Sequence, residues 1–283
     1  MSRSFAAQAP ARAAGLAMGH TLFFGFPVPR PDLPLPRGAI PASYLISSAE
    51  DMSHYLVAQL RGEYRGVRIL SHEGIAQMHQ PAAVASMVGA PPAHYAMGWF
   101  VSESGVATVL SHGGNVADFS ADIALVPSRD LGIAMLYNAD NILLLFRIHA
   151  ISWGVLERVA GMAISPFDQS LQYLTRALLG IALAQLVAFA ISIATLRRWS
   201  GDARARPRGF WRFVRVGAPL AFDLAIASSL VPLAGGYFHV LLLNAPDLTW
   251  IILGCGIFSL AWGIGRTVAA IAILRRAPAS GQA

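Results

Sequence analysis

Three long apolar runs near the C-terminus limit the structures that this chain can adopt. They cover residues 174–196, 216–240 and 248–274. Because a bilayer has a hydrocarbon core about 30 Å thick and a helix rises about 1.5 Å per residue, roughly 20 residues cross it. The alternative is that these runs form buried helices of a soluble domain, but three such runs in succession make this interpretation less favourable. We therefore predict a membrane-embedded, all-α region of three helices over residues 174–283.

The arginines around these runs predict how the chain is oriented in the membrane. The loop at residues 197–215 holds seven arginines and one acid, and the third run ends at Arg275 and Arg276. Residues 237–247, between the second and third runs, contain no arginine. Arginine-rich short loops remain in the cytoplasm. We therefore expect a multi-pass protein of the cell membrane, with an extracytoplasmic N-terminal domain and a cytoplasmic C-terminus.

The charge balance also narrows the function. The net charge of +6 comes largely from the arginines beside the apolar runs, and no basic patch with interleaved aromatic residues accompanies it. We therefore expect no nucleic-acid partner. All basic residues other than histidine are arginine, so any mechanism that needs a lysine is excluded for this chain acting alone.

The first 165 residues have the pattern of an α+β domain: an antiparallel sheet with flanking helices, joined by a linker at residues 166–173. Residues 1–40 are rich in proline and glycine, which predicts extended surface chain rather than helix. Ser47 to Glu50 reads as a capping box, and Ser71 as a second helix start. Four β-rich runs and a closing helical segment follow, at residues 95–101, 106–110, 119–126, 131–137 and 141–160.

A search for chemical motifs leaves one candidate segment. The sequence has no Gly-x-Ser-x-Gly elbow, no phosphate-binding glycine loop and no His-Glu-x-x-His, so we expect no cofactor and no metal. The segment His112-Gly113-Gly114-Asn115 follows a predicted strand, and glycines at a strand edge let a ligand approach the backbone. A hairpin turn with an exposed histidine explains the same pattern.

The order of several segments resembles the C-terminal half of the serine β-lactamase and penicillin-binding-protein-like hydrolases, on the class C and esterase side. The matching fragments are Gly19-His20, Pro41 to Met52, Leu70 to Met78, Tyr95 to Trp99, Ser111 to Gly114, Phe119 to Pro127 and Leu131 to Asn138. In that family the third active-site box is Lys-Thr-Gly or His-x-Gly. The resemblance implies that His112 occupies this box and that His112, Gly113, Gly114 and Asn115 bind substrate, with His112 also orienting it or assisting proton transfer.

The chain departs from the family at the nucleophile. The resemblance implies acyl transfer through a serine in Ser-x-x-Lys, supported by Tyr-x-Asn or Ser-x-Asn, and neither box occurs here. Residues 2–19 also contain no uninterrupted apolar signal segment. We therefore expect a domain that lacks the family's N-terminal half and is inactive alone.

Three functional hypotheses follow. The first is a membrane-anchored serine hydrolase domain that acts on amide or ester substrates, such as cell-wall peptides or β-lactams. The second is a non-catalytic membrane protein whose extracytoplasmic domain binds a peptide or a partner. The third is complementation, in which a separate chain supplies the missing half.

One charged residue falls well inside each of the second and third predicted spans. Asp223 lies about eight residues beyond Arg215 and Arg266 about nine before Arg275, which gives them similar depths on antiparallel helices. Intramembrane charges usually pair or line a functional cavity. We predict that Asp223 and Arg266 form a structural pair.

Overall fold

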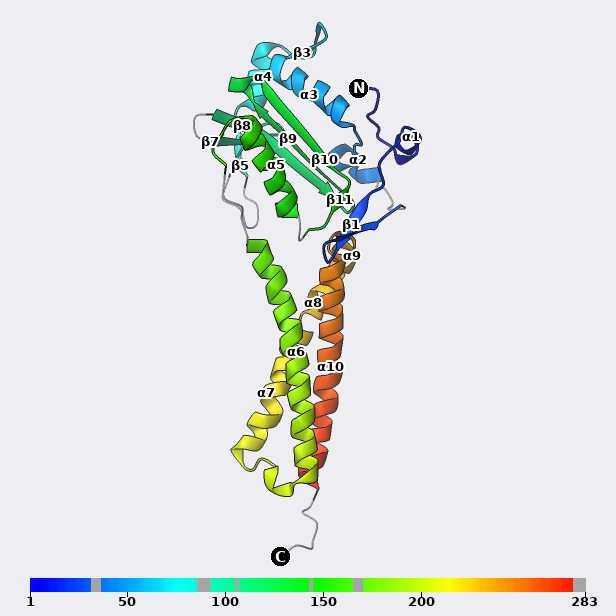
Figure 1. Ribbon diagram of the computed structural model, residues 1–283, viewed down its shortest axis with the longest axis vertical. Helices are drawn as coiled ribbons and strands as arrows, with labels where there is room; N and C mark the ends of the chain where they lie inside the picture. The colour runs from blue at the N-terminus through cyan, green and yellow to red at the C-terminus, as the bar shows by residue number, and fades with distance from the viewer. Residues whose placement is uncertain (32–36, 86–92, 105–106, 143–144, 165–169, 277–283) are drawn as a thin grey trace, which may run out of the picture. The chain divides into compact units, whose positions relative to one another are not determined.

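A computed structural model describes residues 1–31, 37–85, 93–104, 107–142, 145–164 and 170–276. The chain divides into two compact units, Met1–Asp168 and Gln169–Ala283, and each is described by itself. Unit 1 combines sheets and helices, whereas unit 2 consists of helices (Figure 1). This arrangement confirms the predicted fold class of an α+β domain followed by three long apolar helices.

A six-stranded antiparallel sheet forms the centre of unit 1. Its strand order is β10-β9-β8-β7-β6-β5. The bounds are β5 Ala83–Ala85, β6 Ala93–Tyr95, β7 Phe100–Ser104, β8 Ala107–Val116, β9 Phe119–Val126 and β10 Leu131–Tyr137. Strands β9 and β10 begin and end at the residues that their β-branched and aromatic runs predict.

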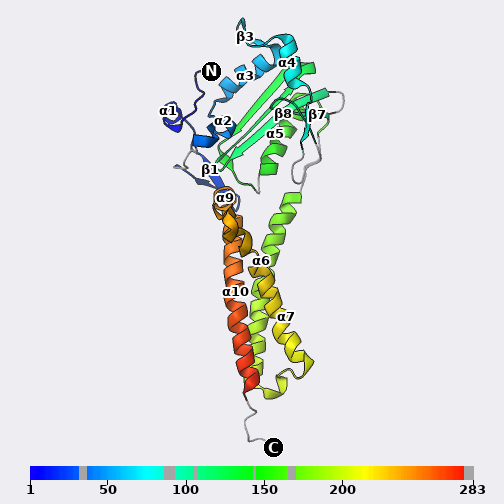
Figure 2. The same cartoon turned by 180° about the vertical axis from the view of Figure 1, so that it is seen from behind.

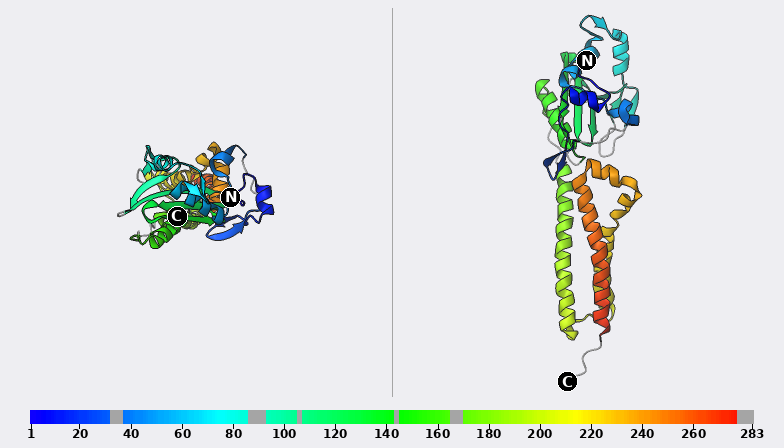
Figure 3. Two further views of the ribbon diagram at one scale, coloured as in Figure 1. Left: turned by 90° about the horizontal axis from the view of Figure 1, so that it is seen from above. Right: turned by 90° about the vertical axis from the view of Figure 1, so that its right-hand side faces the viewer.

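The two faces of this sheet bury different clusters, because alternate side chains of a strand point to opposite sides. On one face, Leu110 and Leu125 pack with Trp99 and with Leu56 of α3 (Ala49–Arg61). On the other, the core comprises Ala107, Val109, Ala124, Val126, Leu156 of α5 (Leu145–Val159) and Ala160, which directly follows this helix. Figure 2 and the right panel of Figure 3 show these two helices on either side of the sheet.

Helix caps explain where two helices of unit 1 begin. The side chain of Ser48, not Ser47, caps α3 and accepts the Asp51 N–H at 3.2 Å, so the N-cap lies one residue later than a capping box from Ser47 to Glu50 requires. Ser71 caps α4 (His72–His79) and accepts the Gly74 N–H at 3.0 Å, as predicted.

The N-terminal segment is more regular than its composition predicts. Helix α1 spans Gln8–Ala13, and Pro10 lies in its first turn, where a missing N–H is tolerated. Strands β1 (His20–Phe23) and β2 (Phe26–Pro29) form an antiparallel pair, and β1 also pairs in parallel with β11 (Ala139–Asp140). The prediction of purely extended chain for residues 1–40 is therefore wrong, although residues 32–36 lie outside the described part. The remaining short elements are η1 Arg37–Ala39, α2 Ile40–Ser43, β3 Glu63–Tyr64, β4 Val67–Arg68 and η2 Pro127–Arg129.

Two predicted strands differ from the observed ones. The run at residues 95–101 is divided between β6 and β7, because Gly98 turns the chain with a φ of 81°. The run predicted at 106–110 continues to Val116, so His112 to Asn115 lie within β8 rather than in a hairpin turn. Residue 106 itself is outside the described part.

Unit 2 contains three helical segments that are long and apolar enough to cross a membrane: Leu179–Gly201, Phe210–Asn244 and Pro246–Arg275. The first belongs to α6 (Ser170–Gly201) and the third is α10. Because α6 begins at Ser170, the described part of the predicted linker is helical. A short η3 (Ala203–Ala205) follows α6 (Figure 3, right panel).

The second segment is not one continuous helix. Its first part, α7 (Phe210–Ala227), contains Pro219, and it is followed by α8 (Leu230–Pro232), the π-turn η4 (Leu233–Tyr237) and α9 (Phe238–Asn244). Inside η4, Gly236 has a φ of 98°, which an L side chain rarely adopts. The apolar run at residues 216–240 therefore predicts that this segment exists, but neither its length of 35 residues nor its breaks.

Candidate functional site

The site predicted from the sequence lies on strand β8, where one edge of the strand is open. His112 to Val116 pair with β9 along the register from Ile123 to Phe119. On the other side, the pairing between β7 and β8 ends at Phe100 and Ser111. Among the described strands, none pairs with β8 beyond Ser111 on that side. Half of the N–H and C=O groups of such an edge point away from the sheet and can bind an extended ligand.

Two aromatic residues hold the side chain of His112. Its Nε2 lies 3.3 Å from the Tyr95 hydroxyl oxygen, within hydrogen-bond distance. The Phe100 ring stacks on the imidazole, with centroids 5.6 Å apart and planes at 28°. Tyr95 and Phe100 also pack edge to face at 4.8 Å. Tyr95 and Phe100 thus position the imidazole, which is only partly buried and therefore reachable from solvent.

The two glycines of the segment have different surroundings. A Cβ on Gly113 would lie 2.6 Å from Cε1 of His149 and 2.7 Å from Oδ1 of Asp122, closer than real Cβ atoms come. These two side chains hydrogen-bond to each other, His149 from α5 and Asp122 from β9. A Cβ on Gly114 would have no atom within 4 Å. A side chain at Gly113 would therefore displace the His149–Asp122 pair, whereas Gly114 keeps the exposed edge free of a side chain.

Asn115 is anchored through a buried carboxyl group. Its amide nitrogen donates to Oδ2 of Asp140 at 3.3 Å, and the Ser120 hydroxyl donates to Oδ1 at 2.7 Å. Asp140 is fully buried, and this loss of hydration raises the pKa of its carboxyl group, while the two donated hydrogen bonds oppose the shift. Asp140 thus connects β11 to the open end of β8.

A second buried carboxyl group lies beside the same region. Asp118, in the turn between β8 and β9, is 8% exposed, and burial raises the pKa of its carboxyl group, while the charge of Arg30 acts in the opposite direction. A Cβ on Gly19 would fall 2.3 Å from its Oδ2, so only glycine fits there. The Gly19-His20 fragment is thereby explained as a close approach of the β1 strand to this turn.

The first 145 residues match a known family. The β-lactamase family model aligns with residues 1–145, about half of the chain. The chain belongs to the β-lactamase family. Protein flp of Staphylococcus aureus, from several strains, is 30% identical over 104 residues, which are 36% of this chain and 19% of the relative. The chain thus spans about a fifth of the length of the curated relatives it matches.

A solved structure is also similar to this β-lactamase-family chain. The octameric penicillin-binding protein homologue from Pyrococcus abyssi aligns with a TM-score of 0.47 and 23% identity. The alignment covers 63% of this chain and 38% of that one.

The sequence pattern does not reveal the side chains that support the predicted His112-Gly113-Gly114 box. Tyr95 belongs to the Tyr95–Trp99 fragment that resembles the family, but nothing in the sequence pattern places its hydroxyl group beside His112. His149 and Asp122 are far apart in sequence, and only the close contact with Gly113 connects them to the box. No group of three or more His, Cys, Asp or Glu side chains that could hold a metal occurs among the described residues.

Asp223 and Arg266 lie in one helix interface of unit 2. Asp223 packs on α10, where a Cβ on Gly263 would lie 2.8 Å from the Asp223 Cβ. The buried Arg266 guanidinium donates to the Ser192 hydroxyl at 3.0 Å, the Arg215 carbonyl at 2.9 Å and the Val216 carbonyl at 3.3 Å. The ion pairs of the described residues do not include one between Asp223 and Arg266. Their direct pairing stays a prediction.

Proposed function

We propose that unit 1 forms one wall of an acyl-serine site of the β-lactamase type and that unit 2 anchors it in the cell membrane. In this proposal unit 1 lies outside the cytoplasm and handles amide or ester substrates, such as cell-wall peptides or β-lactams. The observation that carries the proposal is the position of His112, held by Tyr95 and Phe100 on an open strand edge of a β-lactamase-family sheet.

In this site, β8 binds the substrate in extended form. Backbone groups beyond Ser111 add the substrate as a further strand, and the two glycines keep side chains away from it. Outward N–H groups near Asn115 and Val116 stabilise the oxyanion that develops on the attacked carbonyl. His112 donates a hydrogen bond to the substrate or passes a proton, and Tyr95 maintains the imidazole orientation.

The nucleophile lies outside these 283 residues in this proposal. The 283 residues contain no lysine and therefore no Ser-x-x-Lys. An N-terminal lobe with Ser-x-x-Lys and Tyr-x-Asn supplies the serine, whose oxygen attacks the substrate carbonyl while the lysine accepts the hydroxyl proton. The acyl-serine bond forms as the C–N or C–O bond breaks, and the leaving nitrogen or oxygen takes the proton from the lysine. Attack by water then breaks the acyl-serine bond, releases the acid and returns a proton to the serine oxygen.

A fluorescent penicillin tests this proposal directly. The full chain in detergent micelles is incubated with the probe, alone and with an N-terminal β-lactamase lobe expressed as a separate chain. We expect no labelling of this chain in either case and acylation of the added lobe only when both are present. Labelling of this chain alone would overturn the assignment of the nucleophile to a lobe outside these 283 residues.

His112 provides the matched control for the same experiment. The His112→Ala variant should lower the acylation rate by about 100-fold, the size typical of a positioned acid or base. His94→Ala changes an exposed histidine on β6 and should leave the rate unchanged. If both variants behave alike, the open edge of β8 is not the substrate wall.

A non-catalytic binding function is the second candidate, and the complete lack of lysine favours it. In that case the open edge of β8 binds a peptide or a partner chain without acyl transfer. Isothermal titration with a cell-wall stem peptide separates the two functions. Binding that depends on β8 without acylation by any added lobe supports this candidate, and acylation refutes it.

A further inference from the structure

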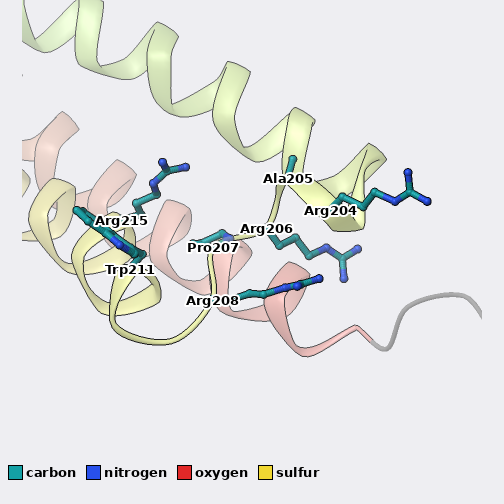
Figure 4. Close-up of a pocket in the computed structure, with 7 residues that line it drawn as sticks. All are labelled: Arg204, Ala205, Arg206, Pro207, Arg208, Trp211 and Arg215. Atoms are coloured by element: carbon teal, nitrogen blue, oxygen red, sulfur yellow. The ribbon is translucent and has the colours of Figure 1, made fainter.

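The loop between α6 and α7 forms an open, strongly basic cavity of about 630 Å³. Its lining residues are Arg204, Ala205, Arg206, Pro207, Arg208, Trp211 and Arg215 (Figure 4). The one acid of this loop, Asp202, caps η3 by accepting the Arg204 backbone N–H at 2.8 Å. The cavity therefore carries four guanidinium groups and no carboxylate in its lining.

Two arginines of the loop maintain the shape of the cavity. Arg206 donates to the carbonyl oxygens of Trp199 and Arg276, at 2.9 and 2.8 Å. Arg212 donates to those of Pro207 and Leu274, at 3.2 and 3.1 Å. Three of these carbonyls belong to the last turns of α6 and α10 or to the residue just after, where helices leave carbonyls without partners. The loop is thus fixed to the ends of two long helices.

The other three arginines of the lining are available to a ligand. Arg204, Arg208 and Arg215 are exposed, and their guanidinium groups have no hydrogen bond or ion pair within the described part of the chain. In Figure 4, the side chains of Arg204, Arg206 and Arg208 extend in the same direction from the loop. The planar guanidinium group fits two phosphate oxygens at once, which makes arginine suited to phosphate.

Aromatic residues beside the cavity point to a lipid as the source of that phosphate. Trp211 is 61% exposed, and its neighbours Phe210 and Phe213 are 73% and 77% exposed at the start of α7. Exposed aromatic rings at the end of an apolar helix are typical of the headgroup level of a bilayer. Basic clusters next to such helices attract anionic lipids.

We propose that this cavity binds the phosphate of an anionic phospholipid headgroup, of which phosphatidylglycerol is the test case. Arg204 and Arg208, whose side chains extend in the same direction in Figure 4, hold the phosphate. Arg215 adds positive charge beside Trp211, which packs beside the glycerol backbone of the lipid. The inference rests on the proposed membrane anchoring of unit 2.

Lipid retention in nanodiscs tests the proposal. The full chain is reconstituted with equal amounts of phosphatidylglycerol and phosphatidylcholine, and lipids that remain bound after release are counted by native mass spectrometry. The cavity variant is Arg204→Gln/Arg208→Gln/Arg215→Gln. The matched control, Arg197→Gln/Arg198→Gln/Arg275→Gln, removes the same charge from exposed positions at the same end of the helices but outside the cavity.

We expect the wild type and the control variant to retain phosphatidylglycerol in preference to phosphatidylcholine. In the cavity variant this preference should be weaker by a factor of about ten or more. Equal losses in both variants would overturn the proposal in favour of diffuse charge attraction. Complete competition by inorganic phosphate would overturn it in favour of a site for the free anion. A wild type without preference for phosphatidylglycerol would also overturn it.

A second measurement uses only the wild type and so does not depend on whether the variants fold. In the wild type in micelles, quenching or enhancement of tryptophan emission is followed during titration with short-chain phosphatidylglycerol and, separately, short-chain phosphatidylcholine. A saturable change with the anionic lipid alone supports the site, and identical responses refute it. Extraction of the protein from vesicles by alkaline carbonate would instead refute the membrane anchoring.

Discussion

Arg266 replaces a hydrogen bond that Pro219 removes from α7. In a regular helix the N–H of residue 219 would donate to the carbonyl of Arg215, four residues earlier, but proline has no N–H. The Arg266 guanidinium, from α10, donates to this carbonyl at 2.9 Å. Apolar surroundings make an unsatisfied carbonyl costly, so this contact couples the two helices at the position of the proline.

The perturbation is a double-mutant cycle with Arg266→Met and Pro219→Ala. Hydrogen bonds from charged donors contribute about 1.5–3 kcal/mol in proteins, but measured interhelical hydrogen bonds in membranes average about 0.6 kcal/mol and reach about 1.7 kcal/mol. The destabilisation of α7 by Arg266→Met should therefore be about 0.6–1.7 kcal/mol smaller in the Pro219→Ala background than in the wild type. The alanine N–H then satisfies the Arg215 carbonyl from within the helix.

Hydrogen–deuterium exchange of the α7 peptide, in the full chain in micelles, measures the free energy of opening for all four proteins. Ser259→Ala serves as the control partner for Pro219→Ala, because Ser259 on α10 accepts a hydrogen bond from Gln185 of α6. That pair should be additive within about 0.5 kcal/mol. If Arg266→Met and Pro219→Ala are equally additive, Arg266 does not compensate for the proline.

The remaining predictions use matched positions in both units. Gly113→Ala should lower the free energy of unfolding of unit 1 by about 1–3 kcal/mol, because the added methyl group clashes with His149 and Asp122. Gly114→Ala should have little effect, and urea titration of the full chain compares the two variants. Gly263→Ala should destabilise the packing of α7 on α10 by a similar amount. Gly265→Ala should not, because a Cβ at that position has no atom within 4 Å; hydrogen exchange of α7 amides compares the two variants. Burial raises the pKa of Asp118, so the native state binds its proton more tightly than the unfolded chain, whose carboxyl pKa is about 3.9. The free energy of unfolding of unit 1 should therefore fall as the pH rises from about 4 through the native pKa, and Asp118→Asn should flatten this slope in exchange measurements on β9.

Local patterns predicted the strands whose pairing and burial alternate regularly. Residues 119–126 and 131–137 form β9 and β10 with the predicted bounds, because their side chains alternate between the two cores. His112 to Asn115 favoured a turn by composition, but pairing with β9 keeps them extended. That pairing is a tertiary effect, which local propensity does not record.

The supports of the candidate site could not be predicted for the same reason. Asp140 reaches Asn115 from a strand that pairs with β1, whose residues lie far away in the sequence. His149 affects Gly113 only because α5 crosses that face of the sheet. In unit 2, apolar length predicted three segments but not the breaks at Ala227 and Gly236, although Pro232 and the Gly235-Gly236 pair are residue types at which helices kink.

The break at Gly236 has a consequence for how unit 2 matches a bilayer. The second segment, Phe210–Asn244, has 35 residues, and as one straight helix it would extend about 52 Å, well beyond a hydrocarbon core of about 30 Å. A straight helix of that length must tilt or thicken the lipid around it, which is hydrophobic mismatch. The turn at Gly236 lets α9 change direction after α7, so the mismatch is absorbed within the chain. Membrane thickness should therefore alter the angle between α7 and α9 more than the tilt of α10.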